Sequence, residues 1–273
     1  MAASNLTLRV ATAVVMLPIL FALLFLGQPW WWLVFLLVAA CLPSAVELYG
    51  MAYPGDRVAQ GVGALSIAAV TVAVYVAPEH PAVLLATVGL LPCVAIVLAL
   101  SRLRDLQPAA VQLMTGVFGP LWIGGGVGAV ALLRKLGAAE GAGLALLPLV
   151  LAWAGDTGGY FAGRAFGKHK LYEKVSPKKT VEGAIGGVAS VVVFALGARA
   201  LVVQSLSIRD TVVLAVFGGV LGILGDLGES LIKRSMGVKD SGGIVPGHGG
   251  MLDRIDAVLV TAPLTLAYWL ALH

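Results

Sequence analysis

The sequence predicts an all-α polytopic membrane protein with about nine transmembrane helices, and two observations carry that prediction. The 273 residues are 59% hydrophobic and only 12% charged, whereas ordinary soluble domains contain about 25% charged residues. The apolar residues also gather in windows of about 20 residues, the length that crosses a bilayer as a helix. Together these observations exclude a water-soluble globule and leave no room for a separate soluble domain.

Nine apolar windows follow one another along the chain, separated by polar residues or by Pro and Gly. The first looks like a secretory signal because Arg9 precedes it, but it continues into Trp30, Trp31 and Trp32, which are typical of the aromatic belt at a membrane interface. We therefore expect a retained first span. The expected helices lie near residues 8–26, 30–50, 58–77, 82–100, 109–133, 143–163, 184–204, 211–232 and 255–272.

Basic residues predict the orientation of these spans. With the N-terminus inside, 14 of the 18 Lys and Arg residues fall on the inner side, which favours a cytoplasmic N-terminus, although the Arg134-Lys135 pair breaks the rule. The same bias explains the net charge of +4 without a nucleic-acid partner. Cys41 and Cys93 lie in separate apolar windows and indicate neither a disulfide nor a zinc site.

The charged residues are concentrated in two windows, residues 153–183 and 226–256, which hold nine charged residues each. Two expected spans separate the windows, so both face the same side of the membrane whichever way the chain is oriented. This concentration predicts one active site that faces the cytoplasm.

The first window combines an acid with a basic loop. Asp156 lies inside an apolar helix, where a carboxylate is costly unless it faces a cavity, a cation or a metal ion, or hydrogen-bonds to a neighbouring helix. Lys178 and Lys179 follow Pro177 at the expected entry of the next helix, whose free N–H groups attract anions such as a triphosphate. Basic inner loops also arise simply to set topology, and that explanation remains open for Lys168 and Lys170.

The second window begins with Asp226, Glu229, Ser230 and Lys233, whose spacing puts them on one helical face. That face suits a cation, although an Asp226–Lys233 salt bridge would explain two of its members.

The same window ends with Asp253 and Asp256, spaced i, i+3 at the expected start of the last helix. Such carboxylates suit Mg²⁺, which proteins hold through one or two carboxylates together with substrate phosphates. A helix N-terminus also favours Asp by itself, so Asp256 has a second explanation as a cap. His248, between glycines, is either a ligand contact or a structural hydrogen-bonding residue.

A string of fixed positions runs through this second window. It consists of Ser230, Lys233, Arg234, Lys239-Asp240-Ser241-Gly242, Pro246-Gly247-His248-Gly249-Gly250, Asp253-Arg254 and Asp256. The string resembles the signature of the phosphatidate cytidylyltransferases, also called CDP-diacylglycerol synthases. Residues 156–160 and 176–183 also resemble pieces of that family, in the family's order, so the motif resemblance covers about residues 150–260.

This resemblance implies that CMP is transferred from CTP to phosphatidic acid, giving CDP-diacylglycerol and pyrophosphate. It implies Mg²⁺ as a cofactor, with K⁺ as an optional companion, and a homodimer among the lipids of the bacterial plasma membrane. We expect residues 1–140 to form a transmembrane scaffold and residues 141–273 to form the catalytic region.

The expected site combines motif and chemistry. The resemblance implies that Asp226 and Asp253 bind the metal ion, and we expect Asp156 or Asp256 to complete its ligand set. The expected catalytic residues are Asp226, Asp253, Lys233 and Arg254. The residues expected to bind CTP or phosphatidate are Lys178, Lys179, Lys233, Arg234, Lys239, Asp240, His248 and Arg254.

Two other functions compete with this interpretation. A CTP-dependent polyprenol kinase shares a related scaffold but would transfer the γ-phosphate and release CDP. A transporter would also bury Asp156 and Asp226 in glycine-rich helices, but no trail of charges crosses the membrane. A CDP-alcohol phosphotransferase is disfavoured because the Gly and Ala-Arg of that family's motif do not follow Asp253-Arg254-Ile255-Asp256.

Overall fold

The computed structural model describes residues 5–103, 105–244 and 249–272, with side chains described from residue 14 onward. In that part of the chain, eight helices are long and apolar enough to cross a membrane, and the shorter apolar helix Val14–Leu26 precedes them. The expected all-α polytopic membrane fold is therefore confirmed.

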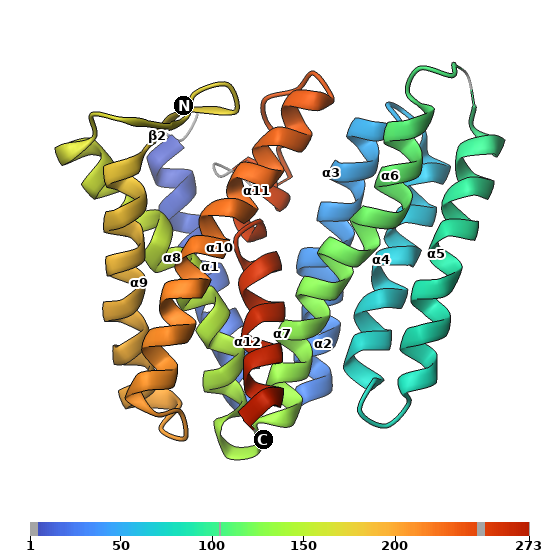
Figure 1. Cartoon of the computed structure of the whole chain (residues 1–273). Helices are drawn as coiled ribbons and strands as arrows, with labels where there is room; N and C mark the ends of the chain where they lie inside the picture. Colours follow the sequence, from blue (N-terminus) through green and yellow to red (C-terminus); the bar gives the residue numbers. More distant parts are fainter. Residues whose placement is uncertain (1–4, 104, 245–248, 273) are drawn as a thin grey trace. The chain divides into compact units, whose positions relative to one another are not determined.

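The helices follow the order expected from the apolar windows, and two short strands lie between α8 and α9 (Figure 1). They are α1 (Asn5–Leu26), α2 (Pro29–Leu36), α3 (Leu42–Ala52), α4 (Arg57–Val76), α5 (Pro81–Ser101), α6 (Ala109–Gly119), α7 (Gly125–Leu136), α8 (Gly141–Phe166), β1 (Lys170–Tyr172), β2 (Ser176–Thr180), α9 (Val181–Val202), α10 (Ile208–Ser235), α11 (Leu252–Ile255) and α12 (Val258–Leu272). The chain divides into two compact units, which we call the first unit (residues 1–131 and 236–255) and the second unit (residues 132–235 and 256–273).

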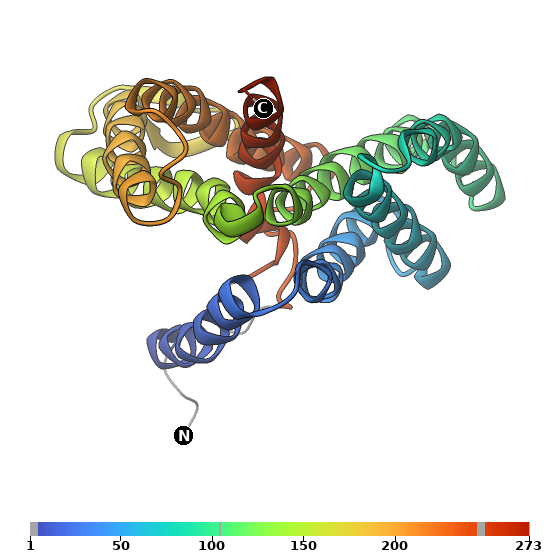
Figure 2. The same ribbon diagram turned by 90° about the horizontal axis from the view of Figure 1, so that it is seen from below.

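In the first unit, α4, α5 and α6 pack beside one another (Figure 2). Asp56 begins α4 by accepting hydrogen bonds from the N–H groups of Val58 and Ala59, both at 3.0 Å, as an N-cap residue does. A π-helical turn, Leu37–Cys41, joins α2 to α3, and a second one, Pro120–Gly124, joins α6 to α7. Two of the expected spans are therefore continuous but irregular.

In the second unit, α8 and α9 run side by side, α10 packs against both, and α12 packs against α8 and α10 (Figure 1). Close approach depends on small residues, since a Cβ atom at Gly183 would lie 2.9 Å from the carbonyl oxygen of Gly159. The Thr261 hydroxyl on α12 donates to the Pro148 carbonyl on α8 at 3.2 Å. These contacts hold together the helices that carry Asp156, Asp226 and Glu229.

The structure differs from the sequence prediction between α8 and α9 and before α12. The basic loop folds into an antiparallel hairpin of β1 and β2, which the sequence analysis did not predict. The last helix was expected to begin at residue 255, but α12 begins at Val258, and a separate short helix, α11, ends before it at Ile255. Asp256 Oδ1 accepts a 2.7 Å hydrogen bond from the N–H of Ala257, and such a local side-chain bond competes with helical hydrogen bonding.

Candidate functional site

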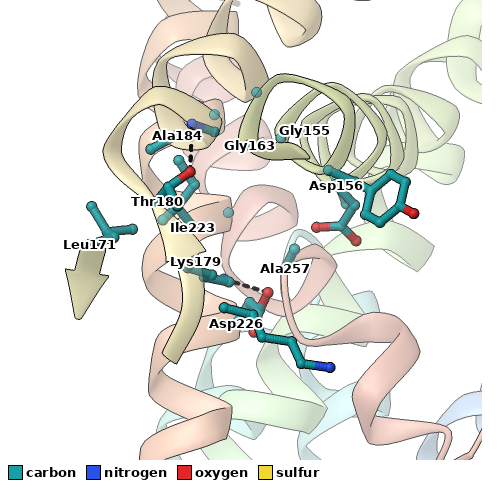
Figure 3. Close-up of a pocket in the computed structure, with 18 of the residues that line it drawn as sticks. Gly155, Asp156, Gly163, Leu171, Lys179, Thr180, Ala184, Ile223, Asp226 and Ala257 are labelled. Carbon is teal, nitrogen blue, oxygen red and sulfur yellow. Dashed lines mark hydrogen bonds and ion pairs between the residues drawn. The ribbon is translucent and has the colours of Figure 1, made fainter. Parts of the chain in front are cut away.

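A cavity of about 380 Å³ lies within the second unit, between α8, β2, α9 and α10, and Ala257 completes its wall. Glycines from α8, α9 and α10 form much of the lining, so the backbone of three helices approaches the cavity closely. The charged groups come from α8, β2 and α10 (Figure 3). The cavity therefore has both apolar walls and a set of polar groups, as small-molecule sites commonly do.

Four of the predicted site residues line this cavity. Asp156 on α8 and Asp226 on α10 are two of the acids that line it, and Lys179 Nζ on β2 forms an ion pair with Asp226 Oδ2 (Figure 3). Lys178 lines the same cavity. Asp226 therefore pairs with a lysine about 47 residues earlier in the chain. The salt bridge considered from the sequence was between Asp226 and Lys233 instead.

The β1–β2 hairpin that carries both lysines is held by Glu182, at the start of α9. The Glu182 carboxylate accepts hydrogen bonds from the N–H groups of Lys168 at 3.0 Å and His169 at 3.2 Å, and it lies 2.6 Å from His169 Nδ1. Thr180 acts as the N-cap of α9, accepting from the Gly183 N–H at 3.1 Å. The hairpin is thus anchored at the end where its lysines line the cavity.

An acidic cluster lies beside the cavity, in the second unit. It consists of Asp226, Glu229 and Asp256, each of which offers a carboxylate oxygen within 4.8 Å of the others. Glu229 and Asp256 are only 1% and 6% exposed. Lys233 Nζ lies 2.6 Å from Glu229 Oε2 and supplies a counter-charge. Carboxylate oxygens at this spacing suit a hard divalent cation such as Mg²⁺.

A second group of acids lies in the first unit, around the Ser241 hydroxyl. Ser241 Oγ donates to Asp253 Oδ2 at 2.8 Å and lies 3.2 Å from Glu47 Oε2. Asp253 Oδ2 also accepts from the Gly250 N–H at 3.2 Å. Because Asp253 and Asp226 belong to different units, their joint role as metal ligands stays a prediction.

The other predicted residues lie mostly at the surface. Lys233 is buried, whereas Arg234, Lys239, Asp240 and Arg254 are exposed. Their roles toward CTP or phosphatidate stay predictions. His248 lies outside the residues that the structure describes.

Several residues that the structure brings into these groups were not predicted from the sequence. Glu229 was placed on the correct helical face but not named as a ligand. Arg164 lines the cavity, and its Nη1 donates to the Tyr160 hydroxyl at 3.0 Å. Glu47 was overlooked, although a single acid within the apolar stretch Leu42–Ala52 is itself a signal of a buried polar contact.

Comparison with known proteins adds the family context. The sequence model of the cytidylyltransferase family matches residues 7–272. Proteins named "Phosphatidate cytidylyltransferase" are similar to part of the chain: that of Haemophilus influenzae is 46% identical over 124 residues, which is 44% of this chain and 43% of the relative. That of Bacillus subtilis is 44% identical over 123 residues, 45% of each chain.

A third relative with the same name, from Thermotoga maritima, is 42% identical over 130 residues, which is 46% of this chain and 48% of the relative. The aligned part of the chain thus spans a little under half the length of each of these curated relatives. The similarity is strong over that part, and the family match extends over nearly the whole chain.

Proposed function

Because this chain belongs to the cytidylyltransferase family, we propose that it transfers CMP from CTP to phosphatidic acid, forming CDP-diacylglycerol and pyrophosphate. The main support for this proposal is the cavity in the second unit. Its lining combines three basic residues with two acids, namely Lys178, Lys179 and Arg164 with Asp156 and Asp226. Cations beside carboxylates are what a metal-bound triphosphate requires. The curated relatives bear the name of this activity.

In this reaction, an oxygen of the lipid phosphate attacks the α-phosphorus of CTP. The new P–O bond forms as the bond from the α-phosphorus to the oxygen of the β-phosphate breaks, and pyrophosphate leaves with the electron pair. The attacking phosphate is already ionised near neutral pH, so no general base is needed. The protein's work is to hold two anions in line and to offset the charge on the leaving group.

The basic residues of the cavity offset the negative charge on the leaving pyrophosphate. Lys178 and Lys179 stand on a hairpin anchored through Glu182, so their ammonium groups are held near a bound triphosphate. Arg164 adds a planar donor set, which suits phosphate oxygens. In binding, the triphosphate competes with Asp226 for Lys179, because the two side chains form an ion pair.

Mg²⁺ fits the donor set of Asp226, Glu229 and Asp256, whose carboxylate oxygens lie within 4.8 Å of one another. When bound, it would act as a Lewis acid on the phosphate oxygens. Asp156, on the cavity wall, is the further acid that we assign to this centre, and K⁺ is the proposed companion ion. The metal-binding role of Asp253, in the first unit, stays a prediction from the motif. Lys233, paired with Glu229 at 2.6 Å, limits the negative charge of the cluster.

We place the active site at the cytoplasmic side of a bacterial plasma membrane, because the basic loops gather there under the positive-inside rule. CTP then reaches the cavity from the cytoplasm while phosphatidic acid arrives within the bilayer. The proposed assembly is a homodimer, which rests on the family resemblance.

Purified protein in detergent with phosphatidic acid, Mg²⁺ and CTP labelled at the α-phosphorus tests the proposal. We expect the label to appear in a chloroform-soluble lipid, with one pyrophosphate released per lipid formed. A kinase would leave the label in CDP and produce no labelled lipid. Label in CDP alone would overturn the proposed transfer in favour of γ-phosphate chemistry.

A further inference from the structure

We infer that Glu47 is a positioning residue for Asp253. In this view Glu47 fixes the conformation of a signature segment, defined as residues 241–244 and 249–253, and thereby the orientation of the Asp253 carboxylate. The functional part of this inference rests on the proposed cytidylyltransferase activity, whereas the structural part does not.

Glu47 holds the end of the signature segment through its two carboxylate oxygens. It lies in the middle of α3 and is 4% exposed. Its Oε1 accepts from the Met251 N–H and its Oε2 from the Leu252 N–H, both at 2.9 Å. These bonds join residues about 200 positions apart in the chain, and hydrogen bonds to a buried carboxylate are among the stronger ones in proteins.

The same carboxylate reaches Asp253 through Ser241. Ser241 Oγ lies 3.2 Å from Glu47 Oε2 and 2.8 Å from Asp253 Oδ2. Asp253 Oδ2 further accepts from the N–H groups of Gly250 at 3.2 Å and Ser241 at 3.4 Å. One hydroxyl therefore stands between two carboxylates, and the backbone that Glu47 holds also supplies donors to Asp253.

Two glycines of the signature leave the space that Glu47 occupies. A Cβ atom at Gly242 would lie 2.8 Å from Glu47 Oε1, and one at Gly250 would lie 2.8 Å from Glu47 Oε2 and 2.9 Å from Asp253 Oδ2. A Cβ at Gly250 would also overlap Ser241 Oγ. The neighbouring Gly243 has no such atom within 4 Å. The glycines that face Glu47 are thus the ones without room for a side chain.

The geometry requires a carboxylate of this length at residue 47. Each oxygen faces a backbone N–H donor, so an amide at this place would turn its NH₂ group toward one of those donors. Aspartate would be shorter by one methylene and would not reach both. Among the described residues, the hydrogen bonds of the Glu47 carboxylate all go to the segment, so we expect its effect on the reaction to pass through Asp253.

Hydrogen exchange measured by mass spectrometry on the full-length protein in detergent tests this inference directly. In Glu47→Gln, we expect the amides of Met251 and Leu252 to exchange at least about tenfold faster, since a lost hydrogen bond opens the segment locally. We also expect the Mg²⁺ concentration for half-maximal activity to rise about tenfold, the size of effect seen when a group supporting a metal ligand is removed. The matched control is Glu140→Gln, because Glu140 accepts bonds from Ser205 in the second unit.

A second pair of variants keeps the test decisive if Glu47→Gln does not fold. Gly242→Ala pushes on the Glu47 side chain but leaves its charge, and we expect it to reproduce both effects; Gly243→Ala should reproduce neither. Unchanged exchange at Met251 and Leu252 in both Glu47→Gln and Gly242→Ala would overturn the inference. If the wild-type protein transfers no CMP, the proposed function fails, and the exchange data still decide whether Glu47 holds the segment.

Discussion

Both compact units bury carboxylates among apolar helices, but they do so in different ways. In the first unit, Glu47 accepts two backbone N–H bonds at 2.9 Å and lies beside a serine hydroxyl, with glycines packed against it. In the second unit, Asp226 lines a cavity and pairs with Lys179. Glu47 is therefore held by backbone N–H donors, whereas Asp226 faces a cavity and pairs with a long lysine side chain.

This difference indicates what each acid contributes. Backbone donors cannot leave without unfolding the segment, so Glu47 contributes to structure. A lysine side chain can exchange one anion for another, so Asp226 and Lys179 are suited to binding. Burial of a charge within a membrane protein is therefore not enough to identify a catalytic residue; the kind of partner separates the two cases.

Replacement of Asp226 is expected to have the largest effect on activity. Asp226→Asn should lower CMP transfer about a thousandfold, because loss of metal-centred charge stabilisation costs several kcal/mol. Its melting temperature should change little, since the substitution also relieves repulsion among clustered acids. Assay of kcat together with thermal unfolding checks both statements.

The control for this variant lies on the same helix. Asp210 accepts from the Tyr268 hydroxyl at 2.8 Å and from Ser207, and Asp210→Asn should keep the activity of the folded protein. Asp226→Asn with near-normal kcat would show that the two ends of α10 do not differ as proposed.

Lys179→Ala is expected to have the next largest effect. Removing one charged donor to a triphosphate costs about 2 kcal/mol, so kcat/KM for CTP should fall about thirtyfold, with the change mostly in KM. Steady-state kinetics at varied CTP provide the measurement. Lys174→Ala, in the exposed turn of the same hairpin, is the control, and an equal loss in both variants would remove any special role of Lys179.

Most of the fold could be predicted from the sequence, because bilayer-length apolar windows bounded by Pro29, Arg57 and Pro81 leave little freedom. The β1–β2 hairpin could not be predicted, because residues 170–180 form a short polar segment. Its base is held by hydrogen bonds to Glu182, which lies outside that segment. The later start of α12, at Val258, was also missed, because the Asp256 side-chain bond to Ala257 has no periodic pattern.

The site was predictable where residues are close in sequence. The face of Asp226, Glu229 and Lys233 follows from helical spacing alone. The contact between Glu47 and Met251 does not, because it is a tertiary contact across 204 positions and depends on glycines that make room for a carboxylate. The motif around Asp253 could be recognised in the sequence, but its partner Glu47, in the first half of the chain, could not.

Gly250→Ala should have a smaller effect than Lys179→Ala on binding of CTP but a clear one on stability. Its Cβ atom would meet Glu47, Asp253 and Ser241, and overpacking of this kind costs about 1–3 kcal/mol. We expect a lower melting temperature and reduced activity, measured by thermal unfolding and CMP transfer. An unaltered melting temperature would show that the first-unit acids are less tightly enclosed than the contacts indicate.

The smallest expected effect concerns Gly228, the neighbour of Glu229 in α10. A Cβ atom there meets nothing within 4 Å, in contrast to Gly250, so Gly228→Ala fills open space within a helix. Alanine is favoured over glycine in helices by about 1 kcal/mol in water, and we expect Gly228→Ala to raise the melting temperature slightly while kcat stays unchanged. A fall in melting temperature equal to that of Gly250→Ala would mean that the acids of the second unit are enclosed as firmly as Glu47, and the distinction between a structural and a binding carboxylate would then lose its physical basis.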